Sequence, residues 1–243
     1  MQTDPPILSI IVPCYNSGTF LQKELPVFIQ FLNIHIPDFE LILVDDGSLD
    51  PTATKALALS YGCGFYQQPR NMGKGAALRQ GFSMANGKVQ IFTDSDFPFE
   101  PDVILVILEK ILAGSAEVVI GDRTNPISEY YIKVSLIRKM GSYLIAGIGK
   151  RLLKNNIIDT QCGMKGFSRS AAQKLFPATI TTGFGIDFEL LLLASKLGFK
   201  IEKVPVHLRT NYPSSINVVS DGLKIIKEIY HAIKHHGRNK KKG

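Results

Sequence analysis

Short apolar runs that alternate with stretches of helical periodicity constrain the fold of this chain more than any other feature. The runs are rich in β-branched residues and recur at residues 7–15, 40–46, 63–68, 88–94 and 117–122. Helical spacing of apolar residues fills the stretches between them, at 19–32, 51–61, 74–86 and 101–113. Strands that are apolar on both faces and alternate with helices are typical of a parallel sheet covered on both sides. The sequence therefore predicts an α/β fold with a Rossmann-like, mostly parallel central sheet.

The second half of the chain is less regular. Its pattern predicts a helical stretch, a glycine-broken strand, a helix and a strand at residues 128–153, 162–169, 186–197 and 200–208. A last helix is predicted over 218–236, with lysines on its other faces and one apolar stripe made of Val219, Leu223, Ile226, Tyr230 and Ile233. We therefore expect a main domain over residues 1–217, followed by a basic amphipathic helix and tail over 218–243.

Composition and charge exclude several classes of protein. The chain has 243 residues, 45% of them hydrophobic, which suffices for one large domain with a buried core. Its 3 cysteines lack metal-ligand spacing, which indicates free thiols in a reducing compartment. We expect neither a signal peptide nor a spanning helix, since no segment has the roughly 18–20 apolar residues required. The net charge of +7 favours anionic lipid or nucleic acid as a partner.

Carboxylates follow three of the predicted strands. They are Asp45, Asp46, Asp94, Asp96 and Asp122. Ligands of an open parallel sheet bind beyond the carboxyl ends of its strands, where gathered carboxylates repel one another unless a cation offsets them. A hard divalent cation commonly takes one or two protein carboxylates together with phosphate oxygens. The sequence therefore predicts Mg²⁺ or Mn²⁺ carrying a diphosphate, although the Asp94–Asp96 pair alone would also fit a capped turn before a helix that begins at Pro101.

A glycine-rich stretch at residues 69–81 resembles a phosphate loop only weakly. It matches neither G-x-x-x-x-G-K-[ST] nor G-x-G-x-x-G, which argues against a P-loop nucleotidase and a dinucleotide oxidoreductase. Two interpretations stay open: a glycine turn that leads into a helix with Arg70, Lys74 and Arg79 on the surface, or a loop that helps to hold a nucleotide. A triad hydrolase is not indicated either, because G-x-S-x-G is missing.

Taken together, the motifs "SIIVPCYN", "ILVDDGSLD", "NMGKGAALRQG", "FTDSDFPFEP" and "IGDR" resemble those of family-two glycosyltransferases with the GT-A fold. They occur in the order usual for that family, between residues 7 and 125. The later stretches "DTQCGMKGFSR" and "GIDFELLLLASKLGFKIEKVPV" resemble the subgroup of dolichyl-phosphate β-glucosyltransferases and dolichyl-phosphate mannose synthases. The resemblance implies an inverting, metal-dependent transfer of a hexose from a nucleotide sugar.

The same resemblance implies the residues of the site. The nucleotide-sugar site would comprise Pro13, Tyr15, Asn16, Ser17, Val44, Asp46, Lys74, Asp94, Ser95 and Arg209. Asp94 and Asp96 would be the D-x-D pair that binds Mg²⁺ or Mn²⁺, with Asp96 as the direct ligand. Arg123 would meet phosphate, and Asp96, Arg123 and Asp187 are the expected catalytic residues.

The chain departs from the family pattern at three places. Ser17 stands where the first motif usually ends in an acid, which weakens the expected ribose contact. Pro98 follows the D-x-D pair and cannot supply the extra side-chain ligand that some mannosyl relatives have there. The loop at 209–217 lacks the lysine expected near Ser215, which weakens its assignment to donor binding.

The resemblance further implies UDP-glucose as donor, with GDP-mannose as the alternative, and a polyprenyl (dolichyl or undecaprenyl) phosphate as acceptor. An acceptor phosphate is already ionised at neutral pH and needs no general base. An acceptor hydroxyl on a lipid or glycan would need one. Asp159, Asp187 and Glu189 are the acids placed to serve in that case, although Asp187 also fits a helix N-terminus. A non-catalytic binding module is the remaining alternative.

A lipid acceptor implies work at a membrane surface. We expect a cytoplasmic protein bound peripherally to the membrane through the basic helix at 218–236 and the stretch at 128–153, each surface lysine contributing about 1 kcal/mol. Packing of the helix on the main domain is the alternative. Nucleic acid is not an expected partner, because aromatic residues are not interleaved with the basic tail. Whether a separate membrane protein anchors the chain is left open.

Overall fold

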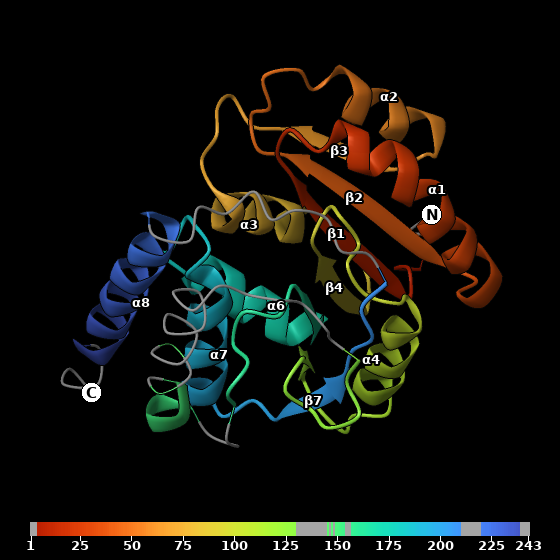
Figure 1. The fold of residues 1–243 in the computed structure, drawn as a ribbon. Coiled ribbons are helices and arrows are strands. Elements are labelled where there is room, and N and C mark those ends of the chain that lie inside the picture. Colours follow the sequence, from red (N-terminus) through yellow and green to blue (C-terminus); the bar gives the residue numbers. More distant parts are fainter. Residues whose placement is uncertain are drawn as a thin grey trace.

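A computed structural model describes residues 4–129, 145, 147, 149–153, 157–209 and 220–238. Within these residues one sheet of seven strands forms the centre of the fold, in the order β3-β2-β1-β4-β6-β5-β7 (Figure 1). The strands are β1 Leu8–Cys14, β2 Phe39–Asp45, β3 Gly64–Gln67, β4 Val89–Thr93, β5 Val118–Asp122, β6 Met164–Ser168 and β7 Ile201–Pro205.

The sheet is mostly parallel, as predicted. Neighbours β1–β2, β1–β4, β2–β3 and β5–β7 all run parallel. Strand β6 is the exception, since it runs antiparallel to both β4 and β5 and lies between them. Its register places Lys165 opposite Phe92 on one side and Ile120 on the other, so a lysine occupies the middle of the sheet.

Helices cover both faces of the sheet. They are α1 Gly18–His35, α2 Thr52–Ser60, α3 Lys74–Met84, α4 Asp102–Leu112, α6 Arg169–Leu175, α7 Ile186–Leu197 and α8 Ser220–Arg238, with a short 3₁₀ helix η1 at Phe176–Ala178. The predicted α/β class is therefore confirmed, and α1, α2, α3, α4, α7 and α8 begin and end close to the expected residues, whereas α6 and η1 were not predicted. Of the helical stretch expected at 128–153, most residues lie outside the described part, which shows residues 145, 147 and 149–152 as helical.

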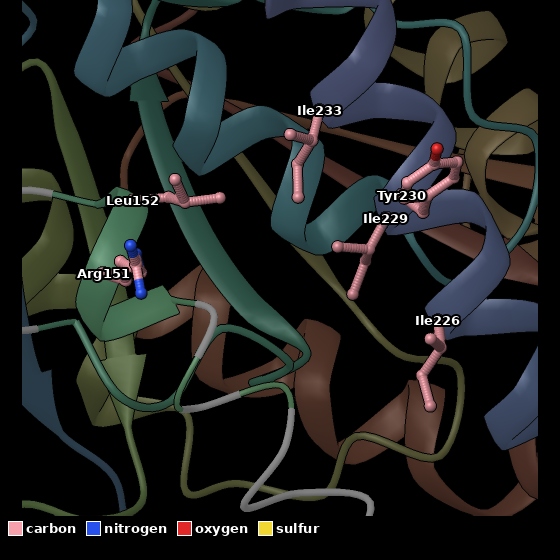
Figure 2. Close-up of a pocket in the computed structure, with 6 residues that line it drawn as sticks. All are labelled: Arg151, Leu152, Ile226, Ile229, Tyr230 and Ile233. Carbon is pink, nitrogen blue, oxygen red and sulfur yellow. The ribbon is translucent and has the colours of Figure 1, made fainter.

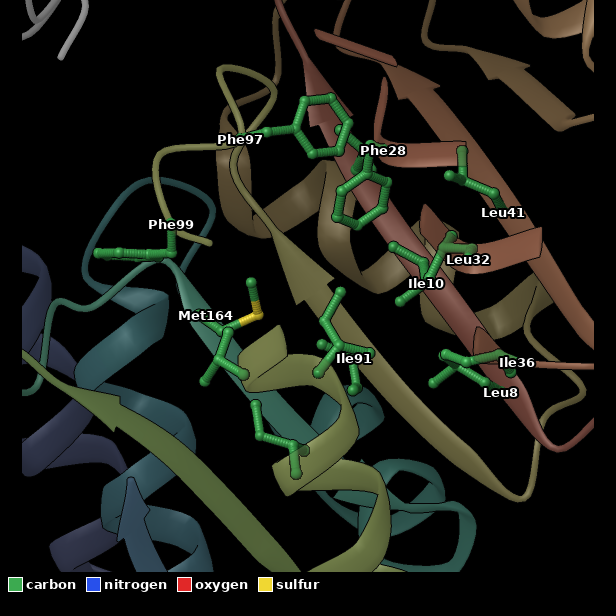
Figure 3. Packing of buried hydrophobic residues seen from close by; sticks show 14 of the residues in the cluster. Leu8, Ile10, Phe28, Leu32, Ile36, Leu41, Ile91, Phe97, Phe99 and Met164 are labelled. Atoms are coloured by element: carbon green, nitrogen blue, oxygen red, sulfur yellow. The ribbon is translucent and has the colours of Figure 1, made fainter. Parts of the chain in front are cut away.

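Two apolar clusters follow from the alternation of side chains along the strands. On β2, Leu41 and Leu43 belong to the cluster beneath α1 and α4, whereas Ile42 and Val44 belong to the one beneath α3, α6 and α7. Figure 3 shows part of the first cluster, where the rings of Phe28 and Phe97 lie 4.4 Å apart between their centres. Both faces of the central strands β1, β4 and β5 are thus covered, whereas the edge strand β3 is largely exposed, which explains why the central strands are mostly apolar.

Helix α8 packs against α7 at one end of the molecule (Figure 1). The face in contact differs from the predicted stripe: Ile229 and Ala232 are buried, whereas Leu223 and Tyr230 are 66% and 61% exposed. Val219 lies outside the described residues. The alternative in which the whole stripe packs on the main domain is therefore wrong: α8 packs through a neighbouring face that shares Ile233 with the stripe, and polar contacts from Glu228 and His236 add to the apolar packing.

Part of the predicted stripe lines an open groove instead. The groove has a volume of about 330 Å³ and lies between α8 and residues 151–152 (Figure 2). Its lining is Arg151, Leu152, Ile226, Ile229, Tyr230 and Ile233. In the part of the chain that the structure describes, no helix combines the length and the hydropathy needed to cross a membrane.

Candidate active site

The carboxyl ends of β1, β2 and β4 bring three predicted segments to one edge of the sheet. Ser17, after β1, lies beside Ser95, after β4, with 2.8 Å between their hydroxyl oxygens. Asn16 has a positive φ of 50°, and its backbone N–H donates to Ser48 Oγ at 2.8 Å, which ties the β1 loop to the β2 loop. Ser17, where the family pattern has an acid, therefore contacts the D-x-D loop directly.

The predicted nucleotide-binding residues of β1 and β2 differ in access. Tyr15 is 46% exposed and Pro13 is half-buried, so both can contact a ligand. Val44 is fully buried beneath α3, so in this arrangement its side chain cannot contact a ligand. Asp46 is buried, and its two carboxylate oxygens accept the backbone N–H groups of Met72 and Gly73, each at 2.8 Å. Burial raises the pKa of Asp46, although both amides favour its ionised form.

The glycine-rich stretch packs against the segment before α7. A Cβ on Gly73, whose φ is +96°, would lie 2.4 Å from Thr182 O, and one on Gly75 would lie 2.5 Å from Thr181 O. The N–H of Gly75 donates to Thr182 O at 2.7 Å, so this amide at the start of α3 is engaged by the protein. The glycine-turn interpretation is favoured. Its surface placement of Lys74 and Arg79 is wrong: the Lys74 side chain is 9% exposed between Asp94 and Asp187, and Arg79 Nη1 donates to Thr181 O at 2.5 Å.

Asp94 and Asp96 follow β4 and turn the chain through Phe97, which has a positive φ of 43°. The side chain of Asp94 is 39% exposed, and its Oδ2 lies against Gly163, where an added Cβ would come within 1.8 Å of it. Burial and the nearby charge of Asp94 raise the pKa of Asp96 to about 6. The pair thus carries negative charge that a divalent cation would stabilise.

The side chains at this edge fit a metal shared with phosphate. Among the described residues no group of three or more His, Cys, Asp or Glu side chains gathers to hold a metal by itself. Two carboxylates are the protein share that Mg²⁺ commonly takes when phosphate and water supply its remaining ligands. Asp94 and Asp96 would therefore hold the ion jointly with a bound diphosphate.

A chain of alternating charges leads from Asp94 into the core. Lys74 Nζ lies 2.9 Å from Asp94 Oδ1 and 3.1 Å from Asp187 Oδ2. Lys165 Nζ pairs with Asp187 Oδ1 and donates to Cys162 O at 2.6 Å. Burial alone would raise the pKa of Asp187, but the two lysines more than offset this and hold the pKa below its usual value.

Sequence reasoning missed Lys165. Its side chain is 0% exposed, and its ammonium lies 5.3 Å from the centre of the Phe92 ring. A lysine within an apolar strand that is covered on both faces needs a charged partner, because an unpaired buried charge is very costly. That rule would have singled out the lysine in "CGMKGFSR".

Arg123 follows β5 and forms a two-pronged pair with Asp159. Its Nε and Nη2 donate to Asp159 Oδ2 and Oδ1 at 2.8 and 2.6 Å, and its backbone N–H donates to Oδ2 at 2.9 Å. Burial would raise the pKa of Asp159, but the guanidinium outweighs it and the pKa lies below its usual value. Arg123 is thus held rigidly at the edge where phosphate is expected.

Glu189 and Arg209 are both engaged with protein partners. Glu189 is buried and accepts the N–H groups of Ile180 and Thr181 at 2.9 and 2.8 Å, and its Oε1 lies 2.6 Å from His236 Nε2. Arg209 lies beside the D-x-D loop, where its backbone N–H donates to Pro98 O at 2.8 Å. Its guanidinium pairs with Glu24 of α1. The rest of its loop lies outside the described residues.

Known proteins are similar to this chain in sequence. Residues 9–176 match the family described as glycosyl transferase family 2. The chain is 32% identical over 249 residues to the dolichyl-phosphate beta-glucosyltransferase of Saccharomyces cerevisiae, covering 91% of this chain and 72% of that protein. Identity to the protein of that name from Dictyostelium discoideum is also 32%, over 241 residues and with equal shares covered.

Solved structures share the fold at lower identity. Glucosyl-3-phosphoglycerate synthase from Mycobacterium tuberculosis, in complex with UDP, is 19% identical with a TM-score of 0.73, covering 93% of this chain and 80% of that one. Mannosyl-3-phosphoglycerate synthase from Rubrobacter xylanophilus is 17% identical with a TM-score of 0.73, covering 96% and 75%. The fold is therefore GT-A, and the chain is a glycosyltransferase that belongs to glycosyl transferase family 2.

Proposed function

We propose that this glycosyltransferase moves glucose from UDP-glucose to a polyprenyl phosphate, with inversion at the anomeric carbon. The observation that carries the proposal is the engagement of the three acids considered as general bases. Asp159 is paired with Arg123, Asp187 with two lysines, and Glu189 with two backbone amides and His236. An acceptor that is already ionised fits a site whose candidate bases are occupied.

The reaction with a phosphate acceptor balances without a base. One phosphate oxygen attacks the anomeric carbon, the bond from that carbon to the diphosphate breaks, and UDP leaves with the electron pair. No proton has to be removed from the acceptor. Arg123, fixed by Asp159, would stabilise charge on phosphate at the edge of the sheet.

The donor would lie across the carboxyl ends of β1, β2 and β4. The accessible ring of Tyr15 suits a face of the base or ribose, and Asp94 and Asp96 would hold the ion together with the diphosphate. A bound Mg²⁺ or Mn²⁺ supplies a Lewis acid for the leaving diphosphate. Glucosyl-3-phosphoglycerate synthase, of the same fold, was crystallised with Mn²⁺ and UDP, which supports this choice of ion and donor.

Glucose and a lipid acceptor are supported by the relatives. Those from yeast and Dictyostelium are named for transfer of glucose to dolichyl phosphate, and the match covers 91% of this chain. The lipid would be met at the cytoplasmic membrane face, and the open groove beside α8 could receive part of its apolar chain. Exposed Leu223 and Tyr230 lie on the same helix as Lys224 and Lys227, a combination suited to an anionic lipid surface.

Transfer of labelled hexose into an organic-extractable lipid tests the proposal. The full chain is incubated with polyprenyl phosphate, Mn²⁺ or Mg²⁺, and either UDP-glucose or GDP-mannose. We expect label only from UDP-glucose, in a product that releases glucose in mild acid, and none with Asp96→Asn. Label from GDP-mannose alone would show that the donor is GDP-mannose and not UDP-glucose. Metal-dependent nucleotide binding without any lipid label would contradict the phosphate acceptor and favour an acceptor hydroxyl.

A further inference from the structure

The buried lysine of β6 is linked to Asp94 through two intervening charges, Asp187 and Lys74. We propose that the Lys165–Asp187 pair positions Lys74 between Asp94 and Asp187, and thereby sets how tightly the Asp94–Asp96 pair binds a divalent cation. The inference rests on the proposed function, because it takes those two aspartates as the metal ligands. Lys165 and Asp187 are positioning residues here, since neither has to touch the substrate.

The geometry gives each oxygen of Asp187 its own lysine. Lys165 pairs with Oδ1 and Lys74 with Oδ2, the latter at 3.1 Å. The side chains of Lys165 and Asp187 are 0% and 2% exposed, so water cannot replace either partner. Lys165 is further fixed by its bond to Cys162 O at 2.6 Å. Asp187 is therefore held in place as an ion-pair partner on one side of Lys74.

The ammonium of Lys74 forms ion pairs with two carboxylates, those of Asp94 and Asp187. Its Nζ lies 2.9 Å from Asp94 Oδ1, and positive charge at that point opposes a cation on the same carboxylate. Stronger electrostatic attraction to Asp187 moves the Lys74 ammonium away from Asp94. Weaker attraction to Asp187 leaves the ammonium paired with Asp94. The attraction between Asp187 and Lys74 depends in turn on how much of the Asp187 charge is already neutralised by Lys165.

Two isosteric substitutions should thus change metal affinity in opposite directions. Asp187→Asn leaves Lys74 with Asp94 alone and should weaken Mn²⁺ binding roughly tenfold. Lys165→Met leaves both oxygens of Asp187 to Lys74 and should tighten Mn²⁺ binding by a similar factor. Met keeps most of the volume of the lysine stem, so the core stays filled. Mn²⁺ binding to the full chain without donor, followed by electron paramagnetic resonance of the free ion, measures both.

The double variant Lys165→Met/Asp187→Asn separates positioning from simple electrostatics. Its net charge equals that of the unmodified chain, so an effect of charge alone would restore the original Mn²⁺ affinity. Positioning through Asp187 predicts affinity as weak as in Asp187→Asn, because Lys165 has nothing left to act on. Recovery of the original affinity would overturn the proposal.

Two controls complete the experiment. Lys110→Met removes one positive charge from an ion pair with Glu202, the second residue of β7. This substitution should leave Mn²⁺ affinity unchanged. Thermal melting confirms that each variant is folded. Mn²⁺ binding that is lost in Asp96→Asn but equal in all Lys165 and Asp187 variants would refute positioning and leave the metal site standing. Binding that does not depend on Asp96 would instead refute the metal site of the proposed function.

Discussion

Two ion-pair clusters at different places in the fold use the same chemistry and differ in burial. At the active-site edge, Lys165 and Asp187 are 0% and 2% exposed and form the inner end of a charge chain. Near the start of β7, Lys110 and Glu202 form a pair of 2.8 Å with 35% and 25% exposure. Water can replace either partner of the second pair but neither partner of the first. Breaking the buried pair should therefore cost much stability, whereas breaking the partly exposed pair should change stability very little.

The largest expected effect follows from breaking the buried pair. Lys165→Ala leaves Asp187 with one lysine and opens a cavity, and we expect a loss of about 3–5 kcal/mol in the free energy of unfolding. Urea denaturation of both proteins measures it. A loss below about 1 kcal/mol would mean that water reaches Asp187, and the contrast in burial would no longer hold.

Two glycines with positive φ extend the comparison to the backbone. Gly73 and Gly114 have φ values of +96° and +69°, but only Gly73 has atoms within 4 Å of an added Cβ, the nearest being Thr182 O at 2.4 Å. Gly73→Ala should cost about 2–3 kcal/mol and Gly114→Ala about 1 kcal/mol. Melting temperatures of the two variants measure the difference. Equal costs would show that the contact with Thr182 relaxes freely.

Acid sensitivity should come from the buried carboxylate of Asp159, which pairs with the partly exposed Arg123. The folded pKa of Asp159 is lowered, so its contribution to stability is complete above the unfolded pKa of about 3.9 and is lost as pH falls further, towards the folded value. Asp159→Asn should therefore reduce stability at pH 7 and flatten its decline below about pH 4. Urea midpoints measured at pH 7 and at several values below about pH 4 test this, and an unchanged slope in the acid range would contradict it.

The smallest effect is expected at the partly exposed pair of Lys110 and Glu202. Glu202→Gln should change the free energy of unfolding by less than about 1 kcal/mol, and added salt should remove most of that change. Denaturation at low and high salt measures it. An effect that is large and insensitive to salt would place this pair with the buried cluster.

The local sequence predicts most of the fold because short-range patterns determine it. Apolar runs and helical spacing gave the strands and helices, and acids at strand ends gave the edge that holds Asp46, Asp94 and Asp96. Binding roles for Pro13, Tyr15, Asn16, Ser17, Ser95 and Arg209 stay predictions, although the structure places Ser17 beside Ser95 and Arg209 beside Pro98.

The face of α8 could not be predicted in the same way. Both the expected stripe and the packed face have helical spacing, so periodicity does not distinguish them. Glu228 decides between them, because its carboxylate accepts the N–H groups of Gly183 and Gly185 at 3.1 and 2.8 Å, just before α7. Such a contact joins residues more than forty positions apart.

Local patterns along the chain were enough to predict the α/β class and the acidic edge of the sheet, because both depend on residues that are neighbours in the sequence. Which charged side chains pair with one another depends on how the elements pack in space. Lys74, Lys165 and Asp187 come from α3, β6 and α7, and their pairing depends on the antiparallel insertion of β6 between β4 and β5. A buried charge must find its partner wherever the fold places one, and spacing along the chain carries no record of that place.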